Sequence, residues 1–273
     1  MSHTKPIGVF DSGLGGLTVV SELVKRLPNE NLVYFGDTGR VPYGTRSAET
    51  IVRYARQDEE FLTGYSVKLI IAACGTVSSV AAHTANELSV PFIEVVSPAV
   101  ERAVSLTENM KIGVIGTSAT VSSGTFERKL REKLPGCTVV SNACPLLVPL
   151  VENGWINRDD KITRGVVERY LEPIMAAGVD TLILGCTHFP VLKDIIGDVL
   201  GEAVNLVNTG EQAAIAAEKY LTESRLLNTE DRKGTQDFYV SDKVEAFSKT
   251  ASILLGRDIS DSVKYVDISK IGG

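Results

Sequence analysis

The 273-residue chain has few cysteines and no excess of basic residues. Its four cysteines include no Cys-x-x-Cys pair and no Cys/His cluster with zinc-finger spacing, and a chain of this length can fold without disulfides. A formal net charge of -6 argues against a general nucleic-acid binder, which usually carries a basic excess. No apolar run approaches the roughly 20 residues of a membrane span, and the first residues lack a signal peptide's apolar stretch. We therefore expect a cytoplasmic protein with reduced thiols and with no nucleic-acid or membrane partner.

Short apolar runs alternate with longer amphipathic segments along the chain. The apolar runs predict strands at residues 7–10, 31–35, 68–72, 92–96, 111–115, 138–141, 181–184, 204–207 and 237–240. The amphipathic segments predict helices at residues 17–27, 48–64, 77–88, 126–134, 161–177 and 210–221. Several strands are continuously apolar, as strands covered on both faces are. The alternation predicts an α/β fold with mostly parallel sheets.

A faint internal repeat divides the chain into two halves. Residues 7–12 resemble 112–117, and residues 67–76 resemble 179–187, in the same order. Each half would place a Cys-Thr turn at the end of a strand, and two facing halves would bring both thiols to one cleft. We expect one domain from residues 1–97 plus 208–273 and a second from residues 98–207. The polar segment 222–236 is interpreted as a linker, after which the chain returns to one of the halves.

Two cysteines occupy equivalent positions in the two halves. Cys74 and Cys186 each follow an apolar strand and lie close to a threonine. A single buried cysteine usually acts as a small apolar residue, but a pair at equivalent turns indicates a functional role. A helix N-terminus directly after such a turn would favour the reactive thiolate. Cys137 and Cys144 lack this setting, and we interpret them as structural.

Two ionisable residues lie beside the candidate thiols. Asp11 follows the first strand, where it either caps a helix or turn or shares a proton with a thiol. His188 is either a structural residue or a group that shuttles the proton of Cys186 and donates to a substrate carboxylate. The spacing of Cys74, Cys186 and His188 does not favour zinc.

Polar turn residues at these strand ends are candidates for binding an anionic ligand. Hydroxyl donors, each equally suited to capping a helix, are Thr76, Ser78, Thr117, Thr120 and Thr187. Residues 42–44 form a Pro-Tyr-Gly turn, in which Tyr43 could close over a ligand. The glycine-rich run at 13–16 allows close backbone approach to a ligand. It does not match Gly-x-Gly-x-x-Gly, because Thr18 occupies the last position, so no dinucleotide site is expected.

Together these motifs resemble the bacterial glutamate racemases, which are part of the cofactor-independent aspartate/glutamate racemase superfamily. The matching segments, in order over nearly the whole chain, are Asp11-Ser12-Gly13, Pro42-Tyr43-Gly44, Cys74-x-Thr76 and Gly185-Cys186-Thr187-His188-Phe189-Pro190. The last segment is the most specific. The resemblance implies two pseudo-symmetric α/β domains with the active site in the cleft between them.

The resemblance also implies racemisation of L-glutamate to D-glutamate, a peptidoglycan precursor, without pyridoxal phosphate, another cofactor or a metal. Cys74 and Cys186 would act on opposite faces of the substrate Cα, assisted by Asp11 and His188 respectively. Substrate-binding residues would be Asp11, Ser12, Pro42, Tyr43, Gly44, Gly75, Thr76, Thr117, Thr120, Thr187 and His188. A pair of acid/base residues suits racemisation, because inversion at Cα needs a proton removed from one face and a proton delivered to the other. A homodimer is a further expectation.

One residue departs from the family pattern. The family usually has Cys-Asn-Thr where this chain has Cys74-Gly75-Thr76. The amide contact with the substrate is then replaced by a backbone N–H or a water, and we expect Gly75→Asn to be tolerated. Three alternatives stay open: a racemase of another dicarboxylic amino acid such as aspartate, a thiol hydrolase with Cys186 as nucleophile, and a non-catalytic dicarboxylate-binding relative.

Overall fold

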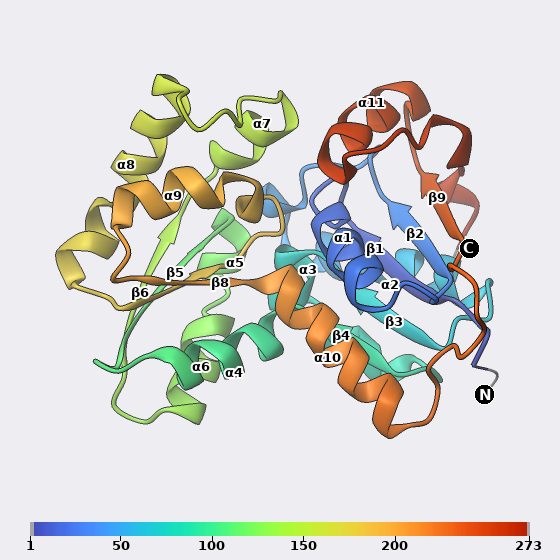
Figure 1. The fold of residues 1–273 in the computed structure, drawn as a ribbon, viewed down its shortest axis with the longest axis horizontal. Coiled ribbons are helices and arrows are strands. Elements are labelled where there is room, and N and C mark those ends of the chain that lie inside the picture. The colour runs from blue at the N-terminus through green and yellow to red at the C-terminus, as the bar shows by residue number, and fades with distance from the viewer. Residues whose placement is uncertain (1–2, 272–273) are drawn as a thin grey trace.

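The strands form two separate parallel sheets (Figure 1). The computed structural model describes residues 3–271. One sheet has the order β10-β9-β2-β1-β3-β4, and the other has the order β6-β5-β7-β8. The strands are β1 (Ile7–Asp11), β2 (Leu32–Gly36), β3 (Leu69–Ala72), β4 (Phe92–Glu94), β5 (Lys111–Gly116), β6 (Thr138–Ala143), β7 (Thr181–Leu184), β8 (Asn205–Asn208), β9 (Gln236–Val240) and β10 (Val263–Tyr265). The expected α/β fold with parallel sheets is confirmed.

The two sheets share one strand order. The arrangement β2-β1-β3-β4 in the first corresponds to β6-β5-β7-β8 in the second, so β1 and β5 are equivalent central strands. The sequence repeat at 7–12 and 112–117 predicted this equivalence. β9 pairs with β2, so the chain returns after residues 222–236 to the first sheet.

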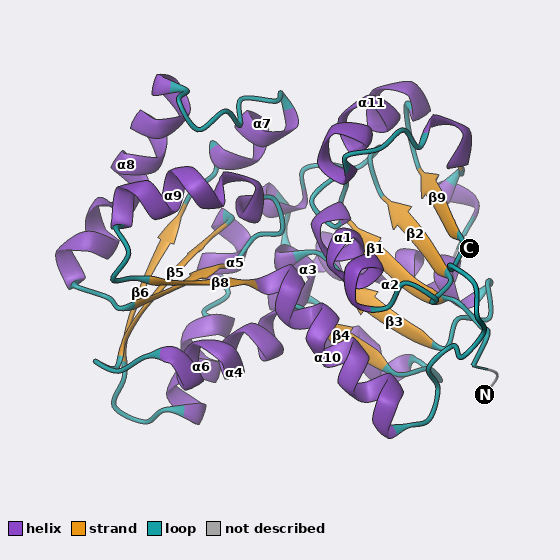
Figure 2. Cartoon of the chain, in the orientation of Figure 1, coloured by secondary structure: helices purple, strands orange, loops and turns teal. Residues whose placement is uncertain are grey.

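Helices cover both faces of each sheet (Figure 2). They are α1 (Leu17–Arg26), α2 (Ala48–Thr63), α3 (Gly75–Val80), α4 (Val96–Leu106), α5 (Ser118–Ser122), α6 (Thr125–Lys133), α7 (Leu147–Glu152), α8 (Lys161–Ala177), α9 (Lys193–Leu200), α10 (Thr209–Glu223) and α11 (Val244–Leu255). In the second sheet, α4 and α6 pack on one face, and α7, α8 and α9 pack on the other.

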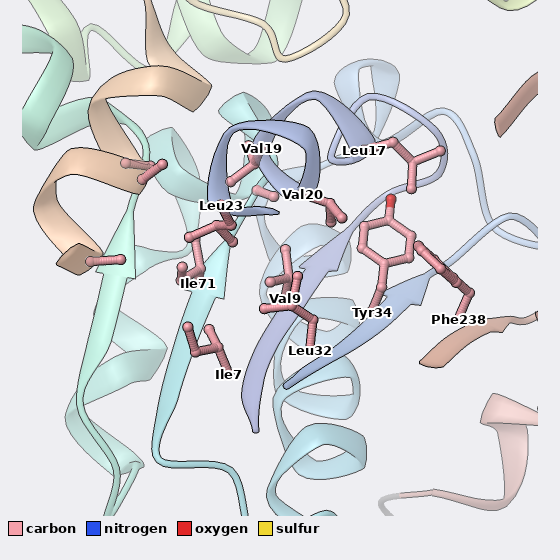
Figure 3. Close-up of a cluster of buried hydrophobic side chains, with 14 of the residues drawn as sticks. Ile7, Val9, Leu17, Val19, Val20, Leu23, Leu32, Tyr34, Ile71 and Phe238 are labelled. Atoms are coloured by element: carbon pink, nitrogen blue, oxygen red, sulfur yellow. The ribbon is translucent and has the colours of Figure 1, made fainter. Parts of the chain in front are cut away.

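Alternate strand residues fill two cores on either side of the first sheet. Val9 and Ile71 pack under Val20 and Leu23 of α1 (Figure 3). Their strand neighbours point to the opposite face and pack against α2. Because both faces are covered, the strands need apolar residues throughout, which explains the continuous runs in the sequence.

Several predicted boundaries were wrong. The helix expected at 77–88 is the short α3 followed by a 3-10 turn, Ala82–Glu87, because the backbone leaves helical geometry at Ala81. The strand expected at 92–96 ends at Glu94, whose carboxylate accepts the N–H of Ser97 at 2.9 Å and so starts α4. The elements not predicted are α4, α5, α7, α9, α11 and β10.

A buried ion pair joins the first sheet to the segment after α10. The ammonium of Lys68 contacts the Glu30 carboxylate and donates to the carbonyl of Leu226 at 2.8 Å, and the Lys68 side chain is fully buried. We expect Lys68→Ala to lower the free energy of unfolding by about 3–5 kcal/mol, because Glu30 would keep a buried charge without its cation. Urea denaturation measures this, with Lys270→Ala as the control. Lys270 pairs with Asp267 at the surface, so its loss should cost less than about 1 kcal/mol. Equal effects would contradict this role.

Candidate active site

A cavity of about 270 Å³ lies between the two halves, where β1, β3, β5 and β7 end. Ligands of parallel α/β sheets bind at this edge, and this volume is below the roughly 300–1,000 Å³ of pockets for drug-sized ligands. Its lining residues are Asp11, Ser12, Val41, Pro42, Tyr43, Gly44, Thr45, Cys74, Gly75, Thr76, Thr117, Ser118, Pro145, Val148, Pro149, Glu152, Cys186, Thr187 and His188. The cavity therefore suits a small metabolite and includes both candidate cysteines.

Cys74 is buried at the start of α3. Its Sγ lies 3.6 Å from Ser12 Oγ. Burial and the nearby charge of Asp11 raise the pKa of the Cys74 thiol to about 12, although a backbone N–H from α3 acts in the opposite direction. The start of α3 acts on Cys74 in the expected direction, toward the thiolate, but burial has the larger effect. The raised pKa favours the protonated form of the Cys74 thiol at neutral pH.

Asp11 lies at the floor of the cavity, almost fully buried. Its Oδ2 accepts the N–H of Gly13 at 2.9 Å, and its Oδ1 has no hydrogen-bond partner among the described residues. The backbone N–H groups of Gly13 and of Gly16, the residue before α1, both favour the charged form of Asp11 and act to lower its pKa. Burial raises the pKa of Asp11, and the charge of His188 opposes this. The unpartnered Oδ1 is an acceptor available to a bound ligand.

Cys186 lies at the end of a chain of contacts through His188, which the sequence indicated, to Glu152, which it did not. His188 Nδ1 is 3.7 Å from Cys186 Sγ, and His188 Nε2 is 3.0 Å from Glu152 Oε1. Burial alone would lower the pKa of His188, but the bonds to Cys186 and Glu152 raise it to about 10. The bond to Glu152 therefore helps to keep His188 charged beside the Cys186 sulfur.

Glu152 gave no signal in the sequence. It ends α7, a six-residue helix that was not predicted. It lies 36 residues before His188, so no spacing rule connects the two. Only the tertiary packing of α7 brings this carboxylate to the histidine.

Some of the candidate hydroxyl residues line the cavity, and others bond only to the surrounding structure. Thr76 Oγ1 lies 3.0 Å from Thr117 Oγ1, so these two connect the halves across the cavity wall. Thr120 is the only expected substrate-binding residue that does not line the cavity, because it packs behind Thr117 and bonds to its hydroxyl at 2.9 Å. Ser78 is structural, since it donates to the carbonyl of Ala72 at 3.2 Å.

The Pro-Tyr-Gly turn contributes a wall of the cavity. Tyr43 is buried, and its hydroxyl contacts the carboxylates of Asp37 and Asp58. This hydroxyl is therefore occupied away from a ligand. Tyr43 still lines the cavity with the rest of its side chain, and its contact with a ligand stays a prediction.

The two cysteine-bearing turns meet backbone to backbone. A Cβ added to Gly75 would lie 2.2 Å from the carbonyl oxygen of Gly185. No backbone atom can accept this overlap without moving. Gly75→Asn therefore requires the two turns to move apart, and its tolerance stays a prediction.

The described residues contain neither a metal-binding cluster nor a membrane-spanning helix. Between residues 3 and 271, no group of three or more His, Cys, Asp or Glu side chains is placed to hold a metal ion. Within the same range, no helix has the length and apolar character needed to span a membrane.

Comparisons with known proteins agree with this geometry. A glutamate racemase of Syntrophus aciditrophicus is 46% identical over 255 residues, covering 93% of this chain and 94% of that protein. The crystal structure of a glutamate racemase isoform from Bacillus anthracis superposes with a TM-score of 0.92 at 38% identity, covering 96% of this chain and 97% of that one. A Francisella tularensis glutamate racemase in complex with D-glutamate has a TM-score of 0.91 at 36% identity, covering 98% and 99%. The Asp/Glu/Hydantoin racemase family matches residues 7–217, the part of the chain that carries both cysteine turns, and the chain belongs to this family.

Proposed function

We propose that the protein is a glutamate racemase that interconverts L- and D-glutamate by two-thiol acid/base catalysis. The observation that carries the proposal is that Cys74 and Cys186 follow equivalent strands of two related halves and line one cavity. The glutamate racemases among its relatives favour glutamate as the substrate. We further propose that the D-glutamate produced serves peptidoglycan synthesis.

The two thiols differ in a way that suits this reaction. The buried Cys74 thiol has a raised pKa and can deliver a proton, while the charged His188 lies 3.7 Å from Cys186 Sγ, where it would stabilise the negative charge needed for proton abstraction. The Cys186 thiolate takes the Cα proton from one face, and the Cys74 S–H donates its proton to the opposite face of the carbanion. The reaction ends with the thiol and the thiolate exchanged, which is the form that deprotonates the D-enantiomer, and proton exchange with solvent after product release restores the starting form.

The surrounding groups supply the electrostatics of the step. Removing the Cα proton of an amino acid builds negative charge beside a carboxylate, which needs oriented donors in a site closed to water. Thr76, Thr117 and Thr187 offer hydroxyl donors at the cavity wall. Asp11 Oδ1 offers an acceptor either for the substrate ammonium or for the proton of Cys74.

Proton exchange at the substrate Cα tests the proposal. In heavy water, a racemase incorporates deuterium at Cα of L-glutamate as it forms the D-enantiomer. A binding protein leaves the Cα proton in place, and a thiol hydrolase forms an acyl-enzyme detectable by mass spectrometry. L-Aspartate under the same conditions decides between the two dicarboxylic substrates. Without deuterium in glutamate, the proposal fails.

The Glu152–His188 bond predicts a pH effect. Because the His188 pKa is raised to about 10 from an ordinary value of about 6.5, the imidazolium persists through neutral pH and is lost as pH rises through about 10. We expect Glu152→Gln to move this loss to lower pH. A hydrogen bond to a charged group is worth about 1.5–3 kcal/mol, so kcat/KM should also fall about tenfold or more.

The pH dependence of kcat/KM measures this effect, with Glu168→Gln as the control. Glu168 forms only an exposed pair with Arg164 on α8. An unchanged alkaline limb in Glu152→Gln would show that the carboxylate does not hold the imidazolium.

The proposal also covers the domain limits, the cellular location and the oligomeric state. We propose domains of residues 1–97 plus 208–273 and residues 98–207, supported by the assignment of β1–β4, β9 and β10 to one sheet and β5–β8 to the other. We also propose a cytoplasmic location and a homodimer. Limited proteolysis tests the domain limits, and analytical ultracentrifugation tests the dimer.

A further inference from the structure

A buried charged cluster lies behind the Pro-Tyr-Gly turn and has no part in the mechanism above. Its members are Asp37 at the end of β2, Arg40, Tyr43 and Asp58 on α2. Both aspartates are fully buried, and Tyr43 is 1% exposed. Two buried carboxylates so close together need a nearby cation or a bound proton, because burying an unpaired charge costs free energy.

The two hydrogen bonds of the Tyr43 hydroxyl require two protons, but one phenol and two ionised carboxylates supply only one. Tyr43 Oη contacts Asp37 Oδ2 and lies 3.0 Å from Asp58 Oδ2. A phenol has one proton, and an ionised carboxylate can only accept. Burial, together with the two nearby carboxylates, raises the pKa of Tyr43, so the hydroxyl keeps its proton and donates it once. The second contact must therefore use a proton from a carboxyl group.

The contacts of Asp37 identify it as the ionised member. Its Oδ2 accepts from Arg40 Nε as well as facing Tyr43, and its Oδ1 accepts from Ser241 Oγ at 2.7 Å. Ser241 Oγ accepts the N–H of Gly39 at 2.8 Å, so its own proton is free to point at Asp37. Three donors directed at one carboxyl group favour its charged form.

Asp58 has the opposite surroundings. Its Oδ1 accepts from Arg40 at 2.9 Å, and its Oδ2 contacts only the Tyr43 hydroxyl. Burial and the charge of Asp37 raise the pKa of Asp58 well above its usual range. With one proton on Asp58, the cation of Arg40 balances the single charge of Asp37, and each contact in the cluster has one donor and one acceptor.

We propose that Asp58 is a protonated positioning residue, which donates to Tyr43 and thereby fixes the turn that forms one wall of the cavity. The inference rests on the proposed racemase function for its kinetic part. The turn is tightly placed, since a Cβ on Gly44 would lie 2.8 Å from Cβ of Thr117 in the other half. The backbone N–H of Asp37 also donates to the carbonyl of Asp11 at 3.0 Å, so the cluster supports two sides of the site.

Matched variants of Asp58 test the proton. Asn places an amide donor where the acid proton lies and keeps an acceptor for Arg40, so Asp58→Asn should keep kcat/KM within about twofold of wild type. Asp58→Ala removes the donor and should raise KM for glutamate about tenfold, with a smaller change in kcat. Asp267→Ala, at the surface, is the control. If Asp58→Asn is as impaired as Asp58→Ala, the carboxylate charge is required and the inference is wrong.

A second measurement does not depend on catalysis. Protein labelled with carbon-13 at the aspartate carboxyl groups should show, at neutral pH, a protonated-acid resonance that disappears in Asp58→Asn and persists in Asp267→Ala. Asp58→Asn spectra that lose only an ionised carboxylate resonance would overturn the inference. If wild type does not racemise glutamate, the proposed function fails, while this spectrum still decides the protonation of Asp58.

Discussion

Replacing either cavity cysteine by serine is expected to reduce racemisation of glutamate by about 10²–10⁴-fold, the usual contribution of one general acid or base. Serine keeps the size of the side chain, but its hydroxyl is a far weaker acid than a thiol. Cys186→Ser removes the base proposed for one face of the substrate, and Cys74→Ser removes the proton donor proposed for the other face. Circular dichroism of the glutamate solution measures the loss in both directions.

Cys137→Ser is the control, because Cys137 is a buried cysteine that does not line the cavity. In heavy water, a single remaining thiol should still exchange the Cα proton of one enantiomer without inverting it. This exchange distinguishes loss of one acid/base group from collapse of the whole site. Near-normal racemisation by both serine variants would refute the two-thiol assignment.

The sequence predicted the residues at the strand ends well, for a physical reason. Parallel strands covered on both faces are short and continuously apolar, so the first polar residues after them mark the functional edge of the sheet. Asp11, Cys74, Thr117 and Cys186 follow this rule and line one cavity. The repeated Cys-Thr turns also indicated the equivalence of β3 and β7, which the strand order confirms.

What the sequence could not predict depends on packing between distant segments. Glu152 reaches His188 because α7 packs against the 3-10 turn Phe189–Leu192 that follows the histidine, and no local pattern marks that helix. The ionisation of Cys74 also depends on burial, which a helix-capping argument does not include. The protonation inferred for Asp58 requires a count of donors and acceptors from three separate segments.

Replacing Gly75 by alanine is expected to lower kcat about 10²-fold, because small displacements of reacting groups can cost that much. The added Cβ would lie 2.2 Å from the carbonyl oxygen of Gly185. The backbone on one side must move, and Cys74 and Cys186 are the immediate neighbours of these two residues. The unfolding free energy should fall by about 1–3 kcal/mol, as in other overpacked sites.

Gly165→Ala is the matched control. Gly165 lies within α8, and a Cβ there meets no atom within 4 Å. Alanine in an open helical position should raise the unfolding free energy by about 0.4–1 kcal/mol and leave kcat unchanged. Steady-state kinetics and urea denaturation of both variants separate the effect of the contact from the general effect of losing a glycine.

Gly75→Asn extends the same test to the residue that the family usually has there. An asparagine carries the same Cβ as alanine, so the overlap with Gly185 is identical, and its amide can contribute only after the two turns separate. We therefore expect kcat to fall at least as far as in Gly75→Ala, even if the amide lowers KM. Wild-type kcat together with a lower KM would show that the halves separate at little cost, and that Gly75 does not set the distance between the two thiols.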